Sequence, residues 1–123
     1  MYKYHLIDGF IFDGSIVKTV QIKSLSDSDK EKVSRIVDLQ FQELISSDNF
    51  NPVNEKHIQS IKGLLLLNEH AAASVSSCNE QQVALTYSDL CNLKLTALDW
   101  NIILTASMAV DELHNGEKAK MLA

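Results

Sequence analysis

The chain has 123 residues, the size of one domain and enough to bury a hydrophobic core without disulfides or metals. Its 16 acidic and 11 basic residues give a formal net charge of −5, which disfavours direct binding to the phosphates of nucleic acid. Residues 1–9 lack the apolar segment of a signal peptide, and the longest aliphatic run, Leu64 to Leu67, is far too short for a membrane span. We therefore expect a cytoplasmic protein whose two cysteines, Cys78 and Cys91, are free thiols.

The first 23 residues predict a β-hairpin. Apolar and polar side chains alternate over residues 2–6, which is the period of a strand. The step Asp13-Gly14 separates two apolar runs, and both positions suit the positive φ angles of a type I′ turn. A second step of the same kind, Asp8-Gly9, predicts a further turn or a bulge within the first strand.

The return strand, over residues 15–23, is expected to have one buried face. The alternation predicts that Ile16, Val20 and Ile22 share the buried face and that Val17 lies on the face in contact with water. Because an isolated hairpin is barely stable in water, we expect this one to pack on helices or on another chain.

A first helix is expected to begin at Ser28, because Ser28 and Glu31 have the spacing of a capping box, and to end near residues 46–47. Its apolar residues recur at helical spacing. They are Val33, Ile36, Val37, Phe41, Leu44 and Ile45. Residues 48–54 are expected to form a loop that contains the only proline, Pro52.

A second helix is predicted from Glu55, capped by Asn54, to the mid-seventies. The run Leu64 to Leu67 covers about three-quarters of its circumference, because successive helical residues are ~100° apart. One core-facing stripe cannot bury all four leucines, so part of this helix is expected to face a partner unless its own domain surrounds it. The polar residues 76–82 that follow are expected to form a loop.

The last third of the chain predicts a short helix or turn over residues 87–95 and then one long helix. Thr96 caps the long helix, with Asp99 as the acidic member of a capping box, and Asn115-Gly116 is a stop signal that leaves residues 117–123 as a frayed tail. The predicted fold class is therefore α+β. One domain would contain an N-terminal β-hairpin over residues 2–23 and a mainly α-helical body of three to four helices over residues 28–116.

The side chains capable of chemistry show no pattern typical of an active site. His70, Cys78, Cys91 and His114 could bind zinc, but their wide spacing matches no compact zinc motif, so a metalloenzyme is a minor alternative. The four glycines are isolated, and neither a GxSxG motif nor a phosphate-binding loop is present. We therefore expect no enzyme activity, no cofactor and no metal. Trp100 either fills the core or anchors a partner.

Two blocks of the sequence have a suggestive order of elements. FIFDGSIVKTVQIKSLSDSD is a hairpin that leads directly into an acidic helix start, and LTYSDLCNLKLTALDWNIILTA follows near the C-terminus. The second block repeats leucine at short intervals before an aspartate and an aromatic residue. These positions are Leu90, Leu93, Leu95, Asp99 and Trp100. In both blocks the chain resembles the tail assembly chaperones of long-tailed bacteriophages.

The resemblance implies a non-enzymatic protein that associates with itself and masks the apolar helices of the tape measure protein before the tail tube polymerises. The expected partner is the tape measure or tail tube protein in the host cytoplasm, without nucleic acid or membrane. The residues expected to contact it are Phe10, Phe12, Leu65, Leu66, Trp100 and Ile103. The alternative is a small phage or plasmid protein that inhibits a host protein by occluding its surface.

Overall fold

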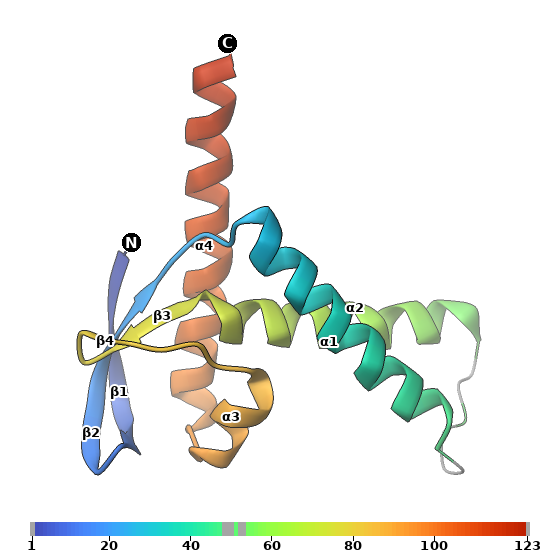
Figure 1. Cartoon of the computed structure of the whole chain (residues 1–123), viewed down its shortest axis with the longest axis horizontal. Coiled ribbons are helices and arrows are strands. Elements are labelled where there is room, and N and C mark those ends of the chain that lie inside the picture. The colour runs from blue at the N-terminus through green and yellow to red at the C-terminus, as the bar shows by residue number, and fades with distance from the viewer. Residues whose placement is uncertain (1, 48–50, 52–53, 123) are drawn as a thin grey trace.

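The structure is a computed structural model that describes residues 2–47, 51 and 54–122. Within these residues an N-terminal β-hairpin precedes a mainly helical body, so the predicted α+β class is confirmed. The elements are β1 (Tyr2–Phe12), β2 (Ser15–Ile22), α1 (Asp27–Ile45), α2 (Glu55–Ser74), β3 (Val75–Cys78), β4 (Gln81–Gln82), α3 (Tyr87–Asn92) and α4 (Ala97–Leu122) (Figure 1). Most of the loop predicted over residues 48–54, including Pro52, lies outside the described residues.

The described strands form one antiparallel sheet in the order β1-β2-β3-β4. Asp13 and Gly14 form the predicted turn between β1 and β2, with φ angles of 51° and 78°. The prediction of a loop over residues 76–82 holds only for the turn at residues 79–80 and is wrong for the rest, because β3 pairs with β2 and β4 pairs with β3. The serines that suggested a loop bond across the sheet instead, and Ser77 Oγ donates to Gln21 Oε1 at 2.9 Å.

β1 contains a bulge at the predicted Asp8-Gly9 step. The pairing of β1 with β2 shifts between His5 and Phe10, so residues 6–9 lie opposite Lys18 alone. This irregularity interrupts the alternation of β2. Val17 is buried and Ile16 is 61% exposed, so their predicted faces are wrong, whereas Val20 and Ile22 are buried as predicted.

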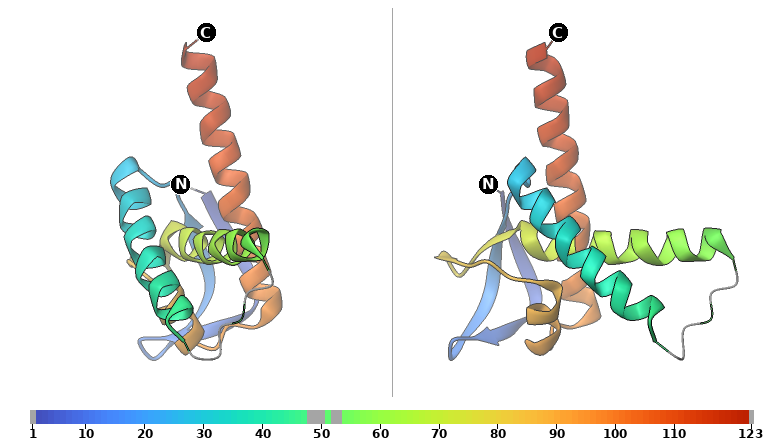
Figure 2. Two further views of the ribbon diagram at one scale, coloured as in Figure 1. Left: turned by 90° about the vertical axis from the view of Figure 1, so that its right-hand side faces the viewer. Right: turned by 45° about the vertical axis from the view of Figure 1, so that its right-hand side comes forward.

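The main core lies between the sheet and α4, and a smaller core lies between α1 and α2 (Figure 2). The buried members of the main core are Leu6, Phe10, Val17, Val20, Ile22, Val75, Cys78, Ile103, Ala106 and Val110. The smaller core consists of Leu25, Val33 and Val37, with Leu65 and Ala73 packed against them. The buried apolar side chains are thus divided between two cores, and neither core encloses the whole length of α2.

The start of α1 differs from the prediction by two residues. Ser26, rather than Ser28, is the N-cap: its Oγ accepts a bond from Asp29 N at 3.1 Å, and Asp29 Oδ2 accepts one from Ser26 N at 3.3 Å. Glu31 pairs with Arg35 instead. Ser26–Asp29 and Ser28–Glu31 both have the spacing of a capping box. Because Leu25 is buried in the smaller core, the helix starts directly after it, with Ser26 as the N-cap.

The end of α4 also differs from the prediction. The helix continues through Asn115 and Gly116 to Leu122, so the expected stop and the frayed tail are wrong for residues 117–122, and Ala123 lies outside the described residues. A glycine within a helix costs about 1 kcal/mol but does not by itself end one. The glutamate, lysines, methionine and leucine that follow Gly116 are good helix formers.

Candidate protein-binding surface

α1 and α2 extend together away from the sheet, and α4 runs across α2 (Figures 1 and 2). Near the crossing, Ala71 and Ala72 of α2 are fully buried, and their small side chains permit a close approach of the neighbouring elements. The N-terminal half of α2 projects beyond α4, so α4 covers only part of it (Figure 1). This arrangement leaves one side of α2 in contact with solvent.

The exposed side of α2 carries most of the leucine run. The side chains of Leu64, Leu66 and Leu67 are 58%, 38% and 36% exposed, whereas Leu65 is partly buried against the smaller core. A Cβ built on the neighbouring Gly63 would meet no atom within 4 Å, so no close helix approach explains this glycine. We call Leu64, Leu66 and Leu67 the leucine face. The expectation that one protomer cannot bury the whole run agrees with these exposures.

A polar contact holds α2 and α4 together where they cross. His70 Nε2 lies 2.5 Å from Asp111 Oδ2, an ion pair when the imidazole is protonated but without the alignment of a hydrogen bond. Ser24 Oγ donates to Asp111 Oδ1 at 3.3 Å. Leu67 precedes His70 by three residues, and Met108, which is 53% exposed, precedes Asp111 by three. Exposed apolar side chains therefore flank the crossing on both helices.

Two of the residues expected to contact a partner lie in the main core. Phe10 and Ile103 are buried between the sheet and α4, so neither side chain can touch a partner in this structure. The sequence shows that both are apolar residues at core-compatible spacing, but it does not distinguish a buried face from an exposed one. Leu66 belongs to the leucine face, and Leu65 is partly buried against the smaller core beside it.

The two remaining predicted residues, Phe12 and Trp100, are partly buried and pack against the main core. The rings of Trp100 and Tyr87 contact each other with centroids 5.2 Å apart, which connects α4 with α3. Trp100 thus contributes to packing while keeping an accessible edge. Leu64 and Leu67 belong to the surface but were not among the individual residues predicted, although the run that contains them was.

A buried carboxylate attaches the hairpin to α4. Asp99 is fully buried; its Oδ1 accepts a bond from Ile7 N at 2.8 Å, and its Oδ2 accepts bonds from Gly9 N at 2.8 Å and Asp8 N at 3.2 Å. Thr96 caps α4 as predicted, since its Oγ1 accepts a bond from Asp99 N at 3.2 Å. The Asp99 carboxylate, however, accepts bonds from backbone N–H groups of the β1 bulge instead of from the backbone N–H of Thr96, as a capping box would require.

A second buried carboxylate connects three helices. Glu69 Oε1 accepts a bond from Gln40 Nε2 at 2.7 Å, and its Oε2 accepts one from Tyr87 N at 3.2 Å, which joins α2 to α1 and to the start of α3. Both oxygens of Glu69 and of Asp99 therefore hold structural bonds. Bonds of this kind satisfy a buried charge and account for both residues without catalysis.

Among the residues that the structure describes, the hydrogen bonds of the titratable side chains do not form the pattern of a catalytic group. In the Ser24–Asp111–His70 arrangement the serine hydroxyl donates to the carboxylate, whereas an activated serine must donate to its base. The four zinc candidates lie on four different elements: His70 on α2, Cys78 on β3, Cys91 on α3 and His114 on α4. Within the described part of the chain, no three His, Cys, Asp or Glu side chains are grouped as metal ligands.

The two thiols differ in environment. Cys78 is buried in the main core, and desolvation by burial raises the pKa of its thiol to about 11. Cys91 lies exposed on α3. Among the residues that the structure describes, none of the helices combines the length and the hydrophobicity needed to cross a lipid bilayer.

No protein-family model matches this sequence, and neither the curated proteins nor the solved structures contain a significant match to it.

Proposed function

We propose that this chain is a non-enzymatic chaperone of phage tail assembly that binds apolar helices of the tape measure protein through its leucine face. The observation that carries the proposal is the exposure of Leu64, Leu66 and Leu67 on the side of α2 that the rest of the fold leaves uncovered. Large side chains grouped in this way on a small protein are typical of a protein-binding surface. The phage assignment comes from the resemblance of the two sequence blocks.

The energy available from the leucine face suits a reversible coat. Complete burial of one leucine contributes about 1.5–3 kcal/mol, so covering the remaining exposed parts of three leucines would contribute roughly 2–4 kcal/mol. That is too little for a tight complex between single copies, because association itself costs several kcal/mol. Several copies bound along one long apolar helix, and contacting each other, would add their contributions and could still be displaced.

The charge of the chain supports the same role. Its formal net charge of −5 would give a coated complex a common negative sign, which opposes aggregation while the apolar helices are covered. An amphipathic helix laid along the exposed side of α2 would place its apolar stripe on the leucine face, as in other helix–groove complexes.

A co-expression experiment tests the proposal. The tape measure protein encoded beside this chain is produced alone, with the unmodified chain, and with the double variant Leu64→Ser/Leu67→Ser. The unmodified chain should keep the tape measure protein in the soluble fraction, and the double variant should lose most of this effect. The control is Leu39→Ser, which removes a leucine that is 68% exposed on α1, outside the leucine face.

Equal protection by the double variant and the unmodified chain would contradict the use of this surface. The absence of a tape measure gene near this one would contradict the phage assignment and favour the alternative, an inhibitor that occludes a host protein. Self-association is measured separately by size-exclusion chromatography with light scattering. A strict monomer at high concentration would argue against a coat built from contacting copies.

A further inference from the structure

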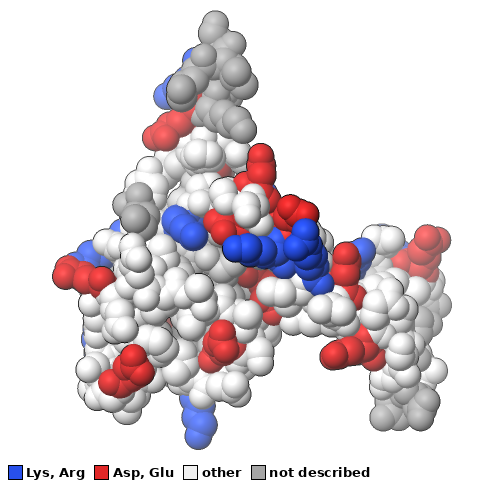
Figure 3. Space-filling model, in the orientation of Figure 1, with Lys and Arg blue, Asp and Glu red and all other residues white. Residues whose placement is uncertain are grey.

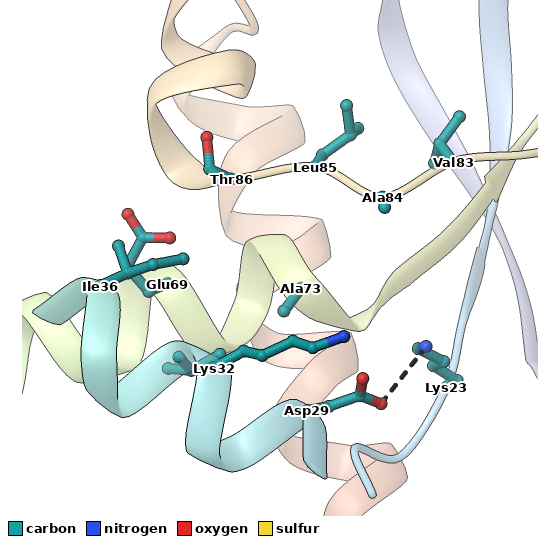
Figure 4. Close-up of a pocket in the computed structure, with 11 residues that line it drawn as sticks. Lys23, Asp29, Lys32, Ile36, Glu69, Ala73, Val83, Ala84, Leu85 and Thr86 are labelled. Carbon is teal, nitrogen blue, oxygen red and sulfur yellow. Dashed lines mark ion pairs between the residues drawn. The ribbon is translucent and has the colours of Figure 1, made fainter.

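A cavity of about 220 Å³ lies between α1, the C-terminal part of α2 and the extended segment over residues 83–86 (Figure 4). It is separate from the leucine face, whose residues do not line it. Its apolar lining comes from all three segments. These residues are Val33, Ile36, Ala73, Val83, Ala84 and Leu85. The cavity thus offers an apolar groove, partly open to solvent, that the proposed chaperone function does not use.

The charged side chains lie at opposite ends of this cavity. Lys23 and Lys32 extend toward each other at one end, and Glu69 lies at the other (Figure 4). Asp29 pairs with Lys23 at 3.4 Å, but no ion pair joins Lys32 to any described carboxylate. Two ammonium groups therefore share one carboxylate, so the lysine end has one positive charge in excess.

The surface around this end carries charges of both signs. On the face shown in Figure 3, lysine and arginine side chains over the N-terminal half of α1 lie among acidic ones. The basic residues of this half, Lys30, Lys32 and Arg35, are matched in number by Asp27, Asp29 and Glu31. An anion would therefore be attracted by the ammonium groups of Lys23 and Lys32 in the cavity itself, and not by a basic surface around it. Glu69 at the far end disfavours a second anionic group there, and a single excess lysine charge favours a monoanion over a dianion.

We propose that this cavity binds a small apolar monocarboxylic acid, with the carboxylate between Lys23 and Lys32 and the apolar body against the walls. The volume corresponds to about seven water molecules at ~30 Å³ each, which suits a body the size of a medium-length acyl chain. The carboxylate forms charge-assisted hydrogen bonds with the ammonium groups, and the apolar body gains by leaving water. The Glu69 oxygens keep the bonds from Gln40 and Tyr87.

Isothermal titration calorimetry with octanoate tests this site. Octanoate should bind saturably at one site per chain, and octan-1-ol, which has the same chain length but no charge, should bind at least tenfold more weakly. The variant Lys32→Gln should weaken octanoate binding about fivefold or more, because it removes a charge-assisted contact. The control is Lys30→Gln, which removes the same charge from an exposed position of α1 that does not line the cavity.

A second variant tests the location independently of charge. Ala84→Leu adds three carbon atoms to an exposed wall position and should obstruct the cavity without burying a new group in the core. It should reduce octanoate affinity while leaving the circular dichroism spectrum and the unfolding midpoint unchanged. Three results would overturn the proposal: no saturable binding of octanoate, equal affinity for octan-1-ol, or equal effects of Lys32→Gln and Lys30→Gln.

Discussion

Replacing Asp99 with asparagine should destabilise the fold strongly, because this side chain accepts three backbone hydrogen bonds from the β1 bulge. The substitution keeps the shape of the side chain but replaces one carboxylate oxygen with an amide NH₂ group. That group would face N–H donors that now lie 2.8–3.2 Å from the carboxylate oxygens. Two donors would then point at each other inside a site that is fully buried at Asp99.

The magnitude follows from the number of bonds lost. A hydrogen bond to a charged acceptor contributes about 1.5–3 kcal/mol, and the asparagine oxygen can replace the carboxylate for only part of the set. We expect Asp99→Asn to lower the free energy of unfolding by about 2–4 kcal/mol. Water can reach Ile7 and Asp8, which are exposed, and this access limits the loss.

Urea unfolding monitored by circular dichroism at pH 7 measures this loss, and amide hydrogen exchange at Ile7 and Gly9 localises it. The matched control is Asp13→Asn, an exposed aspartate of the same hairpin whose φ of 51° asparagine also tolerates. If Asp99→Asn costs no more than Asp13→Asn, the idea that this carboxylate attaches the bulge to α4 is refuted.

The remaining predictions concern two glycines, the α1 cap and the thiols. Gly9→Ala should destabilise the fold by about 2 kcal/mol or more, because Gly9 has a φ of 78° and an added Cβ would lie 2.6 Å from the Val17 carbonyl oxygen. By contrast, Gly63→Ala should stabilise it by roughly 0.5–1 kcal/mol, since α2 has open space there; thermal unfolding distinguishes the two signs. Ser26→Ala should cost about 1 kcal/mol in the same assay, and no loss would contradict its capping role. Iodoacetamide at pH 8 should label only Cys91 in the folded protein and should label Cys78 only after unfolding, and mass spectrometry can show the difference. Burial raises the pKa of the Cys78 thiol from 9.0 to about 11, so between these pH values the folded state retains a proton that the unfolded state loses. The free energy of unfolding should therefore fall as pH rises from 9.0 to about 11.

Local chemistry explains the parts of the fold that were predictable from the sequence. Asp13-Gly14 determined the turn because few other residue pairs accept two consecutive positive φ angles. Asn54 and Thr96 marked helix starts because their side chains accept bonds from backbone N–H groups three residues later. The excess of leucine on one helix was also visible, since a helical stripe can bury only part of its circumference.

The tertiary structure decided what depends on distant residues. The serines of β3 have weak local strand preference, and pairing with β2 makes them a strand. Asp99 has the spacing of a capping acid, yet donors some 90 positions away along the chain take its carboxylate. Likewise, Ile103 and Leu66 are both apolar residues of predicted helices, but the sheet packs against Ile103 of α4, whereas Leu66 of α2 stays 38% exposed. A sequence specifies which side chains need apolar or polar partners, whereas the packing of whole elements determines which partners they meet.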